Sequence, residues 1–430
     1  MVDVGNMSWE NNYLQFKANS NLDSIAANQI RQSSFERFLK TGLPSRKEEA
    51  WKYTGLTDFK SIDWKPVAGE TETITHEHLQ QIAQQLPLEF FNLVFINGLL
   101  NSTLSNNLTD EIQINEVEVG DFNKADQHVE SHMLNLAEAF FSKKLQITLK
   151  KNQIFEKPLH VLFVQSSKSP QYLSQKVIFD LGENSEVTVI VHTLSLDSVN
   201  VGALNINMQI SLADSARMKF IQLQNEDLSS FQFSQTEVSL ESKAHFQNLV
   251  MSLGSALTRN YFHIDFKGRQ ASAAAYGLTI LDAKQHVDNY TFIQHSIGEN
   301  ESVQHYKSIL SGSSQSVFRG RVRIEPNAAK ANSSQLNNNL LLTREAQANS
   351  IPQLEIYNDD VKAGHGSTIG QLNKDEIFYF LSRGINQYEA VKMLSYGYAK
   401  ELIAKFENEY VEKYLTEALY GKLERMIQNV

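Results

Sequence analysis

The chain of 430 residues is acidic, with 39 lysine and arginine residues against 49 aspartate and glutamate residues, and it contains no cysteine. Its length allows more than one hydrophobic core, and we expect two or three folding units. The acidic balance argues against a nucleic-acid partner, because phosphates require a concentrated basic surface. Without cysteine the chain can form no disulfide and offers no thiolate to a metal, a persulfide or a nucleophilic reaction.

The first residues, MVDVGNMSWENN, carry neither a basic start nor an apolar run, so we predict no secretory signal there. No stretch approaches the roughly 18 apolar residues that indicate a membrane-spanning helix. Neither Gly-Lys-Ser nor Gly-Lys-Thr occurs, so the chain is not expected to hydrolyse ATP itself. We therefore expect a cytoplasmic protein without a membrane segment.

The N-terminal region, residues 1–144, is predicted to form a helical and mixed domain. Residues 21–40 carry an imperfect apolar stripe at helical spacing. A further helix is expected near residues 78–86 and a strand at residues 93–97. The rest of this region is polar and shows no clear period.

The motif PSRKEEAWKYTGL follows the first predicted helix. Ser45 and Glu48 have the spacing of a capping box, in which each side chain bonds a backbone N–H at a helix start. Trp51 and Tyr53 are large apolar side chains just downstream. The motif by itself predicts a capped helix attached to a core.

Two histidine pairs occur in the same region. His76 and His78 are two residues apart, so they share a face only in a strand. His128 and His132 are four residues apart, a spacing found in zinc sites on helices. Because V-E-S separates this second pair, the glutamate is not where the general base of H-E-x-x-H stands. Solvated surface histidines are therefore the favoured interpretation of both pairs.

Residues 145–372 are predicted to form a β-domain. Alternating segments such as EVTVIVHTL, ALNINMQISL and ARMKFIQLQN recur about every 13 to 16 residues, separated by Gly, Ser, Asn and Asp. No helical pattern of useful length interrupts them. The array indicates a sandwich, a barrel or a stacked solenoid, and its period does not decide among these folds.

Residues 373–430 are predicted to be helical. Asn373 and Glu376 have capping-box spacing, Gly384 stands where a left-handed C-terminal cap is expected, and Asn386 begins a second helix. The side chains that the first of these helices is expected to bury are Ile377, Phe378 and Leu381.

The last helix carries an apolar stripe at i, i+4, i+8 and i+11, which must face either the β-domain or a partner. The members of this stripe are Leu415, Leu419, Leu423 and Met426.

The junction between the β-domain and the helices reads LEIYNDDVKAGHGSTIGQLNKDEIFYFLSRG. A strand ends at Asp359 and Asp360, and His365 follows between two glycines. The glycines leave the imidazole accessible, and the two carboxylates could fix its tautomer. The alternative is a structural histidine that donates to a backbone carbonyl in a tight turn.

This junction resembles the signature of the SufB/SufD family of iron–sulfur cluster assembly scaffolds, approximately D-D-V-K-C-x-H-G-x-x-x-G followed by F-Y-x-x-S-R-G. Residues 359–362, 365–366, Gly370 and 378–384 carry the match, and the family's frequent cysteine falls on Ala363. The run around Trp51 is similar to the family's N-terminal R/K-x-E-x-W-K-Y motif.

The resemblance implies a right-handed parallel β-helix core over residues 145–372, with about two short strands per winding. Within the family the chain is most similar to SufD, because SufB is understood to receive sulfur on a cysteine. The implied partners are a SufB paralogue, paired through the β-helices as a heterodimer, and the SufC ABC-type ATPase, held by the C-terminal helices. The isolated chain is expected to form a homodimer.

The resemblance also implies site residues. His365, with Asp359 and Asp360, is the candidate for the subunit interface and the nascent cluster, and His365 is the candidate metal ligand. The candidates for binding the ATPase subunit are Phe378, Arg383 and Gly384. No catalytic residue and no tightly bound cofactor are expected; an iron–sulfur cluster would be held transiently in the complex, with which reduced flavin is also associated.

Two other functions remain open from the residues alone. A β-helix carbohydrate-active enzyme would need convergent carboxylates and basic residues on one solenoid face. A purely structural homodimeric scaffold is favoured by the missing cysteine. The strand residues Arg319, Arg321 and Arg323 share a face that could meet an acidic partner, although a solvated face is the commoner explanation.

A second group of strand residues could form a cluster, although scattered strand histidines usually satisfy local hydrogen bonds. Its members are His286, Asp288, His295 and His305.

Overall fold

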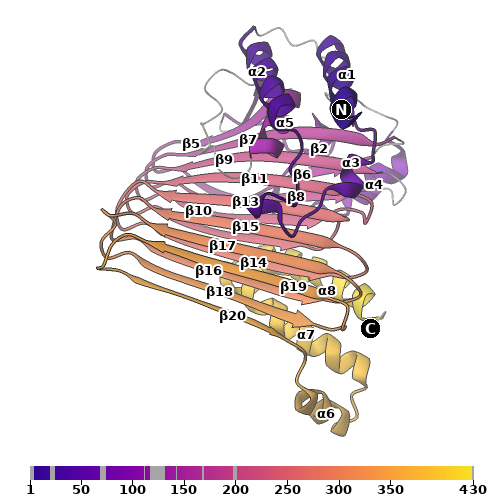
Figure 1. The fold of residues 1–430 in the computed structure, drawn as a ribbon, viewed down its shortest axis with the longest axis vertical. Helices are drawn as coiled ribbons and strands as arrows, with labels where there is room; N and C mark the ends of the chain where they lie inside the picture. The colour runs from indigo at the N-terminus through magenta and orange to yellow at the C-terminus, as the bar shows by residue number, and fades with distance from the viewer. Residues whose placement is uncertain are drawn as a thin grey trace.

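The computed structural model describes residues 4–19, 25–67, 74–110, 112–116, 131–141, 143–166, 169–196 and 201–428. Its body is a parallel β-solenoid, and helices lie at both ends of the chain (Figure 1). This arrangement confirms the predicted mainly β fold with a parallel β-helix core and helical ends. Among the described residues, no helix is long and apolar enough to cross a membrane.

The solenoid consists of two sheets, and successive strands along the chain alternate between them. The odd-numbered sheet contains β5 (Lys143–Leu149), β7 (Gln171–Leu181), β9 (Gly202–Leu212), β11 (Phe231–Leu240), β13 (Leu257–Phe266), β15 (His286–His295), β17 (Gln315–Ile324) and β19 (Gln347–Ile356). The even-numbered sheet contains β6 (Ile154–Gln165), β8 (Glu186–Ser195), β10 (Arg217–Asn225), β12 (His245–Ser252), β14 (Ser272–Leu281), β16 (Glu301–Leu310), β18 (Asn332–Leu341) and β20 (Lys362–Gly370). All of these strands pair in parallel with their neighbours.

One winding of the solenoid contributes one strand to each sheet. Asn260 on β13 and Asn289 on β15 occupy equivalent positions 29 residues apart, and their side chains hydrogen-bond at 2.9 Å. This spacing confirms the expectation of about two short strands per winding. Polar ladders also occur in the Asn337–Asn339 run, where the amide of Asn338 donates to the Thr368 hydroxyl on the next even strand at 2.8 Å.

The corners that lead from the odd to the even sheet turn on residues with left-handed backbone. Asn184, Ser215 and Lys243 have φ of 56°, 60° and 60° at equivalent places after β7, β9 and β11. The corners also stack, because the N–H of Ser215 donates to the carbonyl of Ser242 and that of Lys243 to the carbonyl of Arg269, both at 2.8 Å. The recurrent turn residues of the sequence thus mark the corners of the windings.

The interior of the solenoid, its lumen, changes from apolar to polar along the axis. In the first windings the inward-pointing residues are almost all aliphatic or aromatic, as in Val161, Phe163, Val177, Phe179, Ile206 and Met208. From the middle windings onward the inward positions include buried amides. These amides are Gln222, Asn248, Asn260, Asn289, Gln304, Gln335, Asn337 and Asn339.

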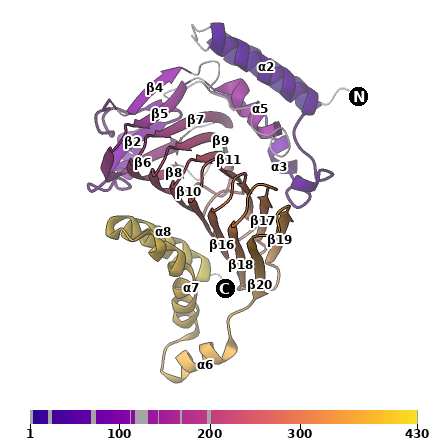
Figure 2. The same cartoon turned by 90° about the vertical axis from the view of Figure 1, so that its left-hand side faces the viewer.

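The N-terminal region supplies α1 (Val4–Asn19), α2 (Ile25–Thr41), the 3-10 turn η1 (Glu49–Trp51), α3 (Thr57–Lys60), α4 (His76–Ala83), α5 (Ser131–Phe140) and the short strands β1 (Lys65–Pro66), β2 (Phe91–Ile96), β3 (Leu99–Leu100) and β4 (Ile112–Glu116). Aromatic side chains of α1, α2, α3 and α5 form one cluster with Tyr172, Phe231 and Phe233 of the odd-numbered sheet. Figure 2 shows α2, α5 and α3 on the side of that sheet. The elements predicted at residues 21–40, 78–86 and 93–97 correspond to α2, α4 and β2.

The capped helix predicted after Ser45 is wrong. The Glu48 carboxylate does accept from the N–H of Ser45 at 2.9 Å, but only the 3-10 turn η1 follows. The segment instead forms successive turns, and its side chains bond to the odd-numbered sheet and to α5, as described below. Helix α1, which the sequence pattern did not reveal, precedes α2.

The C-terminal helices are α6 (Lys374–Ser382), α7 (Gln387–Ile403), the 3-10 turn η2 (Ala404–Phe406) and α8 (Glu409–Ile427). Helices α7 and α8 cover the outer face of the even-numbered sheet, where they pack on residues such as Ile221, Leu249 and Leu278 (Figure 2). The predicted stripe of α8 is buried in this contact and therefore faces the β-core. Its members Leu415, Leu419, Leu423 and Met426 are at most 1% exposed.

Buried lysines fasten these two helices to the solenoid. The ammonium of Lys422 on α8 donates to Asp282 at 2.7 Å and to Gln285 at 2.6 Å, in the corner between β14 and β15. Lys307 on β16 reaches the carboxylate of Glu401 on α7. Each lysine carries its charge into a buried contact, so α7 and α8 are integral parts of the fold.

The predicted N-cap asparagines act at helix starts. The Asn373 side chain accepts from the N–H of Asp375 at 2.9 Å, rather than from that of Glu376 as in a capping box, and that of Asn386 accepts from the N–H of Glu389 at 2.9 Å. Gly384 has the predicted left-handed backbone, with φ of 80°. Helix α7 begins after Asn386 as predicted.

Candidate functional site

The last winding leaves one end of the solenoid open. Strand β19 pairs only with β17, and β20 only with β18, so each keeps a free edge of backbone N–H and C=O groups. None of the residues of β19 or β20 is buried, whereas every earlier winding carries fully buried inward residues. We call β19 and β20 together the open end. A free parallel edge of this length is a template for pairing with another chain.

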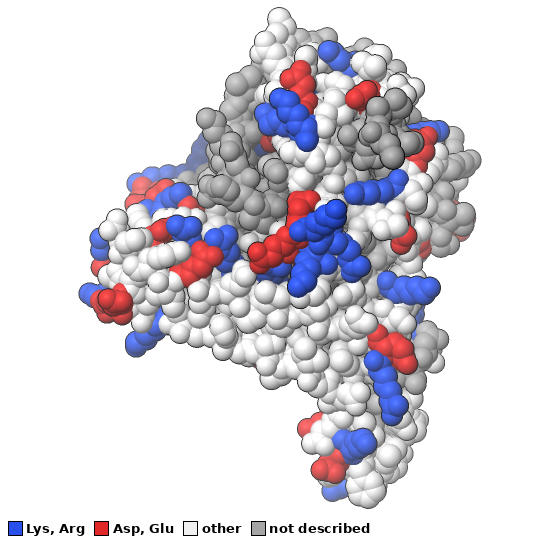
Figure 3. Space-filling model, viewed as in Figure 1, with Lys and Arg blue, Asp and Glu red and all other residues white. Residues whose placement is uncertain are grey.

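The outward face of the open end is uncharged along most of β19. In Figure 3 charged side chains gather over the N-terminal segment in the centre of the view, and the surface of the lower windings carries hardly any. The outward residues of β19 that contribute to this surface are Gln347, Asn349, Ile351 and Gln353. Such a surface suits contact with a protein rather than with a polyanion.

His365 lies on β20 at this open end. Register pairs Ser333 with Ala363 and Gln335 with His365. Ala363 packs against the apolar lumen cluster, so the alternate residue His365 also faces the lumen, and its side chain is exposed because no winding follows. The structure thus confirms that the ring is accessible, and it places the family's cysteine position on the same strand face.

The flanking glycines lie on the opposite, outer face of β20, so they are not what exposes the ring. A side chain at Gly364 would meet nothing within 4 Å, and one at Gly366 would meet only a methyl group of Leu336 at 3.3 Å. Packing within this chain therefore does not require glycine at either position. The bare outer face of β20 is available to a neighbouring molecule.

Asp359 and Asp360 lie in the corner before β20 and are not brought to His365. The carbonyl of Asp360 accepts from the N–H of Lys330 at 2.6 Å, and its N–H donates to Asn358 at 2.9 Å. Both contacts continue the stack of corners. Within the described residues, neither carboxylate has a hydrogen bond or ion pair with the imidazole, so the expected tautomer fixation by these groups has no basis in this geometry.

Helix α6 stands apart from the solenoid beyond β20 (Figures 1 and 2). None of its residues is fully buried, so the predicted burial of Phe378 and Leu381 is wrong, whereas Ile377 is half-buried and packs against the apolar cluster of α7, α8 and the even-numbered sheet. Phe378 is 70% exposed and Leu381 43% exposed. The physical reason is that α6 has no sheet beneath it, because the even-numbered sheet ends at β20. Arg383 lies over the ring of Tyr379 at 5.1 Å, and Gly384 ends the helix.

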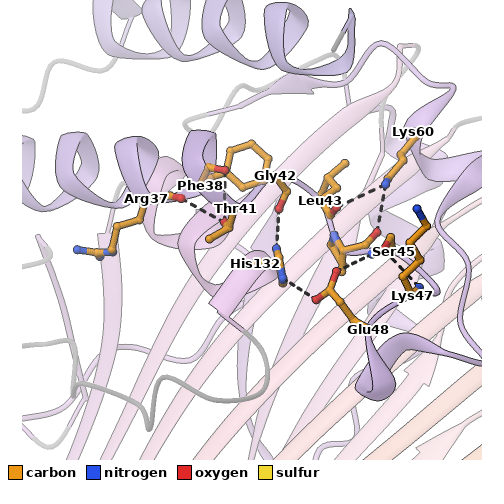
Figure 4. Close-up of polar contacts among 11 residues, drawn as sticks. Arg37, Phe38, Thr41, Gly42, Leu43, Ser45, Lys47, Glu48, Lys60 and His132 are labelled. Atoms are coloured by element: carbon orange, nitrogen blue, oxygen red, sulfur yellow. Dashed lines mark hydrogen bonds and ion pairs between the residues drawn. The ribbon is translucent and has the colours of Figure 1, made fainter. Parts of the chain in front are cut away.

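The N-terminal motif forms a strap, residues 43–56, across the odd-numbered side. Figure 4 shows its start, where His132 of α5 bridges the carbonyl of Gly42 at 2.7 Å and the carboxylate of Glu48 at 2.8 Å. Lys60 closes the loop by donating to the carbonyl of Pro44 at 3.1 Å. These contacts join α2, α5 and α3 to the beginning of the strap.

The end of the strap is anchored on β13 and β15. The Arg259 guanidinium lies over the Trp51 ring at 3.9 Å and pairs with the buried carboxylate of Asp288. The Thr54 hydroxyl also donates to Asp288 and contacts the ring of His286 at 3.0 Å. Trp51 therefore has a structural role, because a cation–π contact between its ring and the Arg259 guanidinium holds the strap on the sheet.

The remaining sequence candidates are mostly satisfied within the chain. Arg319, Arg321 and Arg323 do share the outer face of β17, where they pair with Glu49, Glu355 and Glu325 respectively. Because each guanidinium already has a carboxylate partner, this face does not present the free basic groups that the carbohydrate-active alternative needs.

The second group of strand histidines is not a cluster. His286 and Asp288 lie on the outside of β15, whereas His295 points into the lumen, where burial lowers its pKa to about 4. His305 is on the outer face of the even-numbered sheet and bonds Asn338 at 2.9 Å. His128 lies outside the described residues, so its pairing with His132 is not described.

Sequence reasoning missed a buried polar junction between α8 and the even-numbered sheet. The Tyr414 hydroxyl contacts His192 at 2.8 Å, His160 at 3.3 Å and the carbonyl of Gln85 at 3.3 Å. Burial lowers the pKa of His192 to about 3 and that of His160 well below its usual value, so both rings are neutral. Their wide separation in the sequence left no local signal.

No group of three or more His, Asp or Glu side chains among the described residues is arranged to hold a metal ion. His365 is an exposed imidazole that does not belong to such a group among the described residues. Iron bound there would need further ligands from another molecule.

Family comparisons agree with this architecture. The SufBD core domain of the SUF system for FeS cluster assembly matches residues 163–398, and the SufBD protein N-terminal region matches residues 7–155. The iron–sulfur cluster assembly protein SufD of Escherichia coli is 31% identical and covers 88% of this chain and 89% of its own length. A SufBD family iron–sulfur cluster assembly protein of Synechocystis is 26% identical over 89% and 87% of the two chains. A chloroplastic ABCI7 protein of Arabidopsis thaliana is 26% identical over 93% and 87%.

Proposed function

This chain belongs to the SufBD family of iron–sulfur cluster assembly proteins, and from that premise we propose that it acts as a SufD-like scaffold subunit and not as an enzyme. The observation that carries the proposal is the open end, where His365 stands on a strand with a free edge and no buried residue. A monomer would gain nothing from leaving a parallel edge unpaired, because such edges associate.

The proposed occupant of the open end is a SufB-like paralogue, whose own β-helix would continue the two sheets across the interface. Main-chain hydrogen bonds of the free edges would give affinity, and the uncharged outer face of β19 would exclude strongly charged competitors. A second copy of this chain would take the same place when the paralogue is absent, which is the homodimer expected for the isolated protein.

The proposed binding surface for a SufC-like ATPase is α6 with its C-terminal turn, including Phe378, Arg383 and Gly384. Its support is the exposure of Phe378 and Leu381 on a helix that has no fully buried residue. Helices α7 and α8 then transmit any displacement of α6 to the even-numbered sheet, because both are fastened to it.

In this role the nascent iron–sulfur cluster is cargo. The chain has no thiolate, so the partner would supply the sulfur ligands, and His365 would contribute one imidazole at the seam. We propose that no cofactor is tightly bound by this chain alone, that reduced flavin acts at the level of the complex, and that the complex works in the cytoplasm.

The test is anaerobic co-expression of the tagged full-length chain with SufB and SufC from its own organism. We expect one complex containing all three proteins, and iron and sulfide that depend on His365. His365→Ala should leave the assembly intact and reduce its iron and sulfide. A chain that purifies only with itself, and never with SufB or SufC, would replace this proposal with the purely structural homodimer.

A further inference from the structure

The lumen directly beneath the open end contains a buried amide that lies next to His365. Paired positions on neighbouring parallel strands are about 4.8 Å apart and point to the same side of the sheet. Gln335 on β18 is paired with His365 on β20, and Ala275 and Gln304 continue the same inward column on β14 and β16. The imidazole is therefore the terminal member of a column that runs back into the solenoid.

Gln335 is a buried amide at the outer end of this column. It is 3% exposed, and neither its side-chain oxygen nor its side-chain nitrogen has a hydrogen-bond partner among the described residues. Asn248, three windings deeper, is likewise without a partner there, whereas the oxygen of Gln304 accepts from the Thr291 hydroxyl at 2.8 Å. A buried amide without any partner is costly, because its hydrogen bonds to water are lost on folding. The two side chains paired in register with Gln335 are Gln304 and His365, and of these only the ring of His365 is exposed.

We infer that Gln335 is the positioning residue of His365: its side-chain oxygen accepts from the Nδ1–H of the ring and so turns the bare Nε2 toward the open end. The inference rests on the proposed role of His365. An imidazole that ligates a metal commonly donates its other N–H to an oxygen acceptor, which fixes both tautomer and ring direction. Asp359 and Asp360 lie in the corner before β20, and among the described residues neither carboxylate has a hydrogen bond or ion pair with the ring.

The deeper amide provides a matched control. Gln335 and Gln304 are both buried, both lumenal and in the same column, but only Gln335 is adjacent to His365. Gln335→Leu and Gln304→Leu remove an amide of the same size from the lumen, and Gln304→Leu also leaves the Thr291 hydroxyl without its acceptor, so it tests the loss of a buried polar contact independently of His365. Gln335→Glu keeps an oxygen acceptor beside the ring and serves as the conservative rescue.

The experiment records two-bond ¹H–¹⁵N correlations of histidine side chains in the full-length chain labelled at its 12 histidines, with His365→Ala to assign the signal. We expect the Nδ1–H tautomer of His365 in the native chain, in Gln304→Leu and in Gln335→Glu, and a shift toward the Nε2–H tautomer in Gln335→Leu. An unchanged His365 signal in Gln335→Leu, or an equal change in Gln304→Leu, overturns the inference.

A second measurement separates this inference from the proposed function. In the co-expressed complex, Gln335→Leu should lower the retained iron by about 10-fold or more, as loss of a group that orients a metal ligand commonly does, while Gln304→Leu should not. If His365→Ala lowers the iron and Gln335→Leu does not, the positioning role is wrong and the seam role stands. If neither lowers the iron although the tautomer shifts as expected, the seam role is wrong and the geometry of the pair stands.

Discussion

The two ends of the solenoid differ in how the chain finishes them. At the first end, short antiparallel strands close both sheets, β4 on β5 and β3 on β2, and the lumen between them is filled with aliphatic and aromatic side chains. At the open end, β19 and β20 keep free parallel edges around a lumen that contains buried amides.

The difference explains why the proposed partner is placed at the open end. Antiparallel caps and an apolar filling satisfy the first end within one chain, because short strands leave little edge for another molecule. The free edges of β19 and β20 have no such cap among the described residues. Substitutions at one end or the other test this difference separately.

The largest loss of stability is expected for a substitution in the apolar lumen of the first windings. Phe179 is fully buried in the first windings, so Phe179→Ala should lower the free energy of unfolding by about 3–5 kcal/mol through lost burial and a residual cavity. Ile369 on β20 is 52% exposed, and Ile369→Ala should cost about 0.5 kcal/mol or less in the free chain. Urea unfolding of both variants checks this, and equal losses would mean that the open end is already closed in the free protein.

The stability of the folded chain should depend on pH through a buried carboxyl group, that of Glu226. Burial raises the pKa of Glu226 to about 8, and this carboxyl lies next to Gln224, where the amides begin. The folded state holds this proton more tightly than the unfolded state. The contribution of Glu226 to the free energy of unfolding is therefore fully present below the ordinary carboxyl pKa and is lost as pH rises through 8. Between these limits the loss is about 1.4 kcal/mol per pH unit.

Glu226→Gln should remove that slope, so the variant gains stability over the native chain as pH rises from 5 to 8 and matches it at the acid end. Thermal unfolding as a function of pH measures the difference. The neutral pair His160 and His192 affects the native chain and Glu226→Gln alike. Because burial lowers the pKa of both rings, the free energy of unfolding falls in both proteins as pH drops below the ordinary histidine pKa. A parallel pH dependence of the two proteins would show that Glu226 is not protonated in the native state.

Pairing at the open end should be sensitive to charge. Ile369→Lys places an ammonium on the edge strand, where it would be desolvated by a partner, and should weaken capture of the SufB paralogue about 10-fold, or about 1.4 kcal/mol. The free chain should keep its melting temperature. Leu88→Lys, at a position 91% exposed in the N-terminal region, is the matched control. Binding of the two variants by biolayer interferometry distinguishes them, and an equal loss would remove the open end as the interface.

Binding of the ATPase subunit should likewise be weakened by a charge on α6 and not by one in the N-terminal region. Phe378→Asp leaves the core untouched and should reduce capture of the ATPase subunit several-fold, with Leu88→Asp as its control. A point substitution is the better test here, because removing all of residues 373–430 would also uncover the sheet face that α7 and α8 bury. Retention of the ATPase by Phe378→Asp at native affinity would move its binding surface away from α6.

The smallest effect is expected at a helix cap. Asn386→Ala removes the acceptor for the N–H of Glu389 at the start of α7 and should cost about 1 kcal/mol. Equilibrium unfolding monitored by circular dichroism measures it. The same substitution at Asn373, which caps the detached α6, should not change the cooperative unfolding midpoint, and a comparable shift there would show that α6 is coupled to the core.

The local structure of this protein could be predicted from its amino-acid sequence. Alternation of apolar residues predicted the strands, turn residues predicted the corners, and the side chains of Asn373 and Asn386 and the backbone of Gly384 act at helix ends as predicted. These features depend on residues within a few positions of one another, so their physical causes are contained in short segments. The motif around His365 was likewise readable, because its residues are contiguous.

Tertiary structure alone decided what these elements contact. Phe378 and Leu415 both belong to amphipathic helices, yet Phe378 is 70% exposed and Leu415 is fully buried, because a sheet lies beneath α8 and none lies beneath α6. Thr54 bonds to Asp288 across 234 positions, and Gln335 meets His365 only through strand register. Register and docking are set by the packing of distant surfaces, which no local pattern encodes.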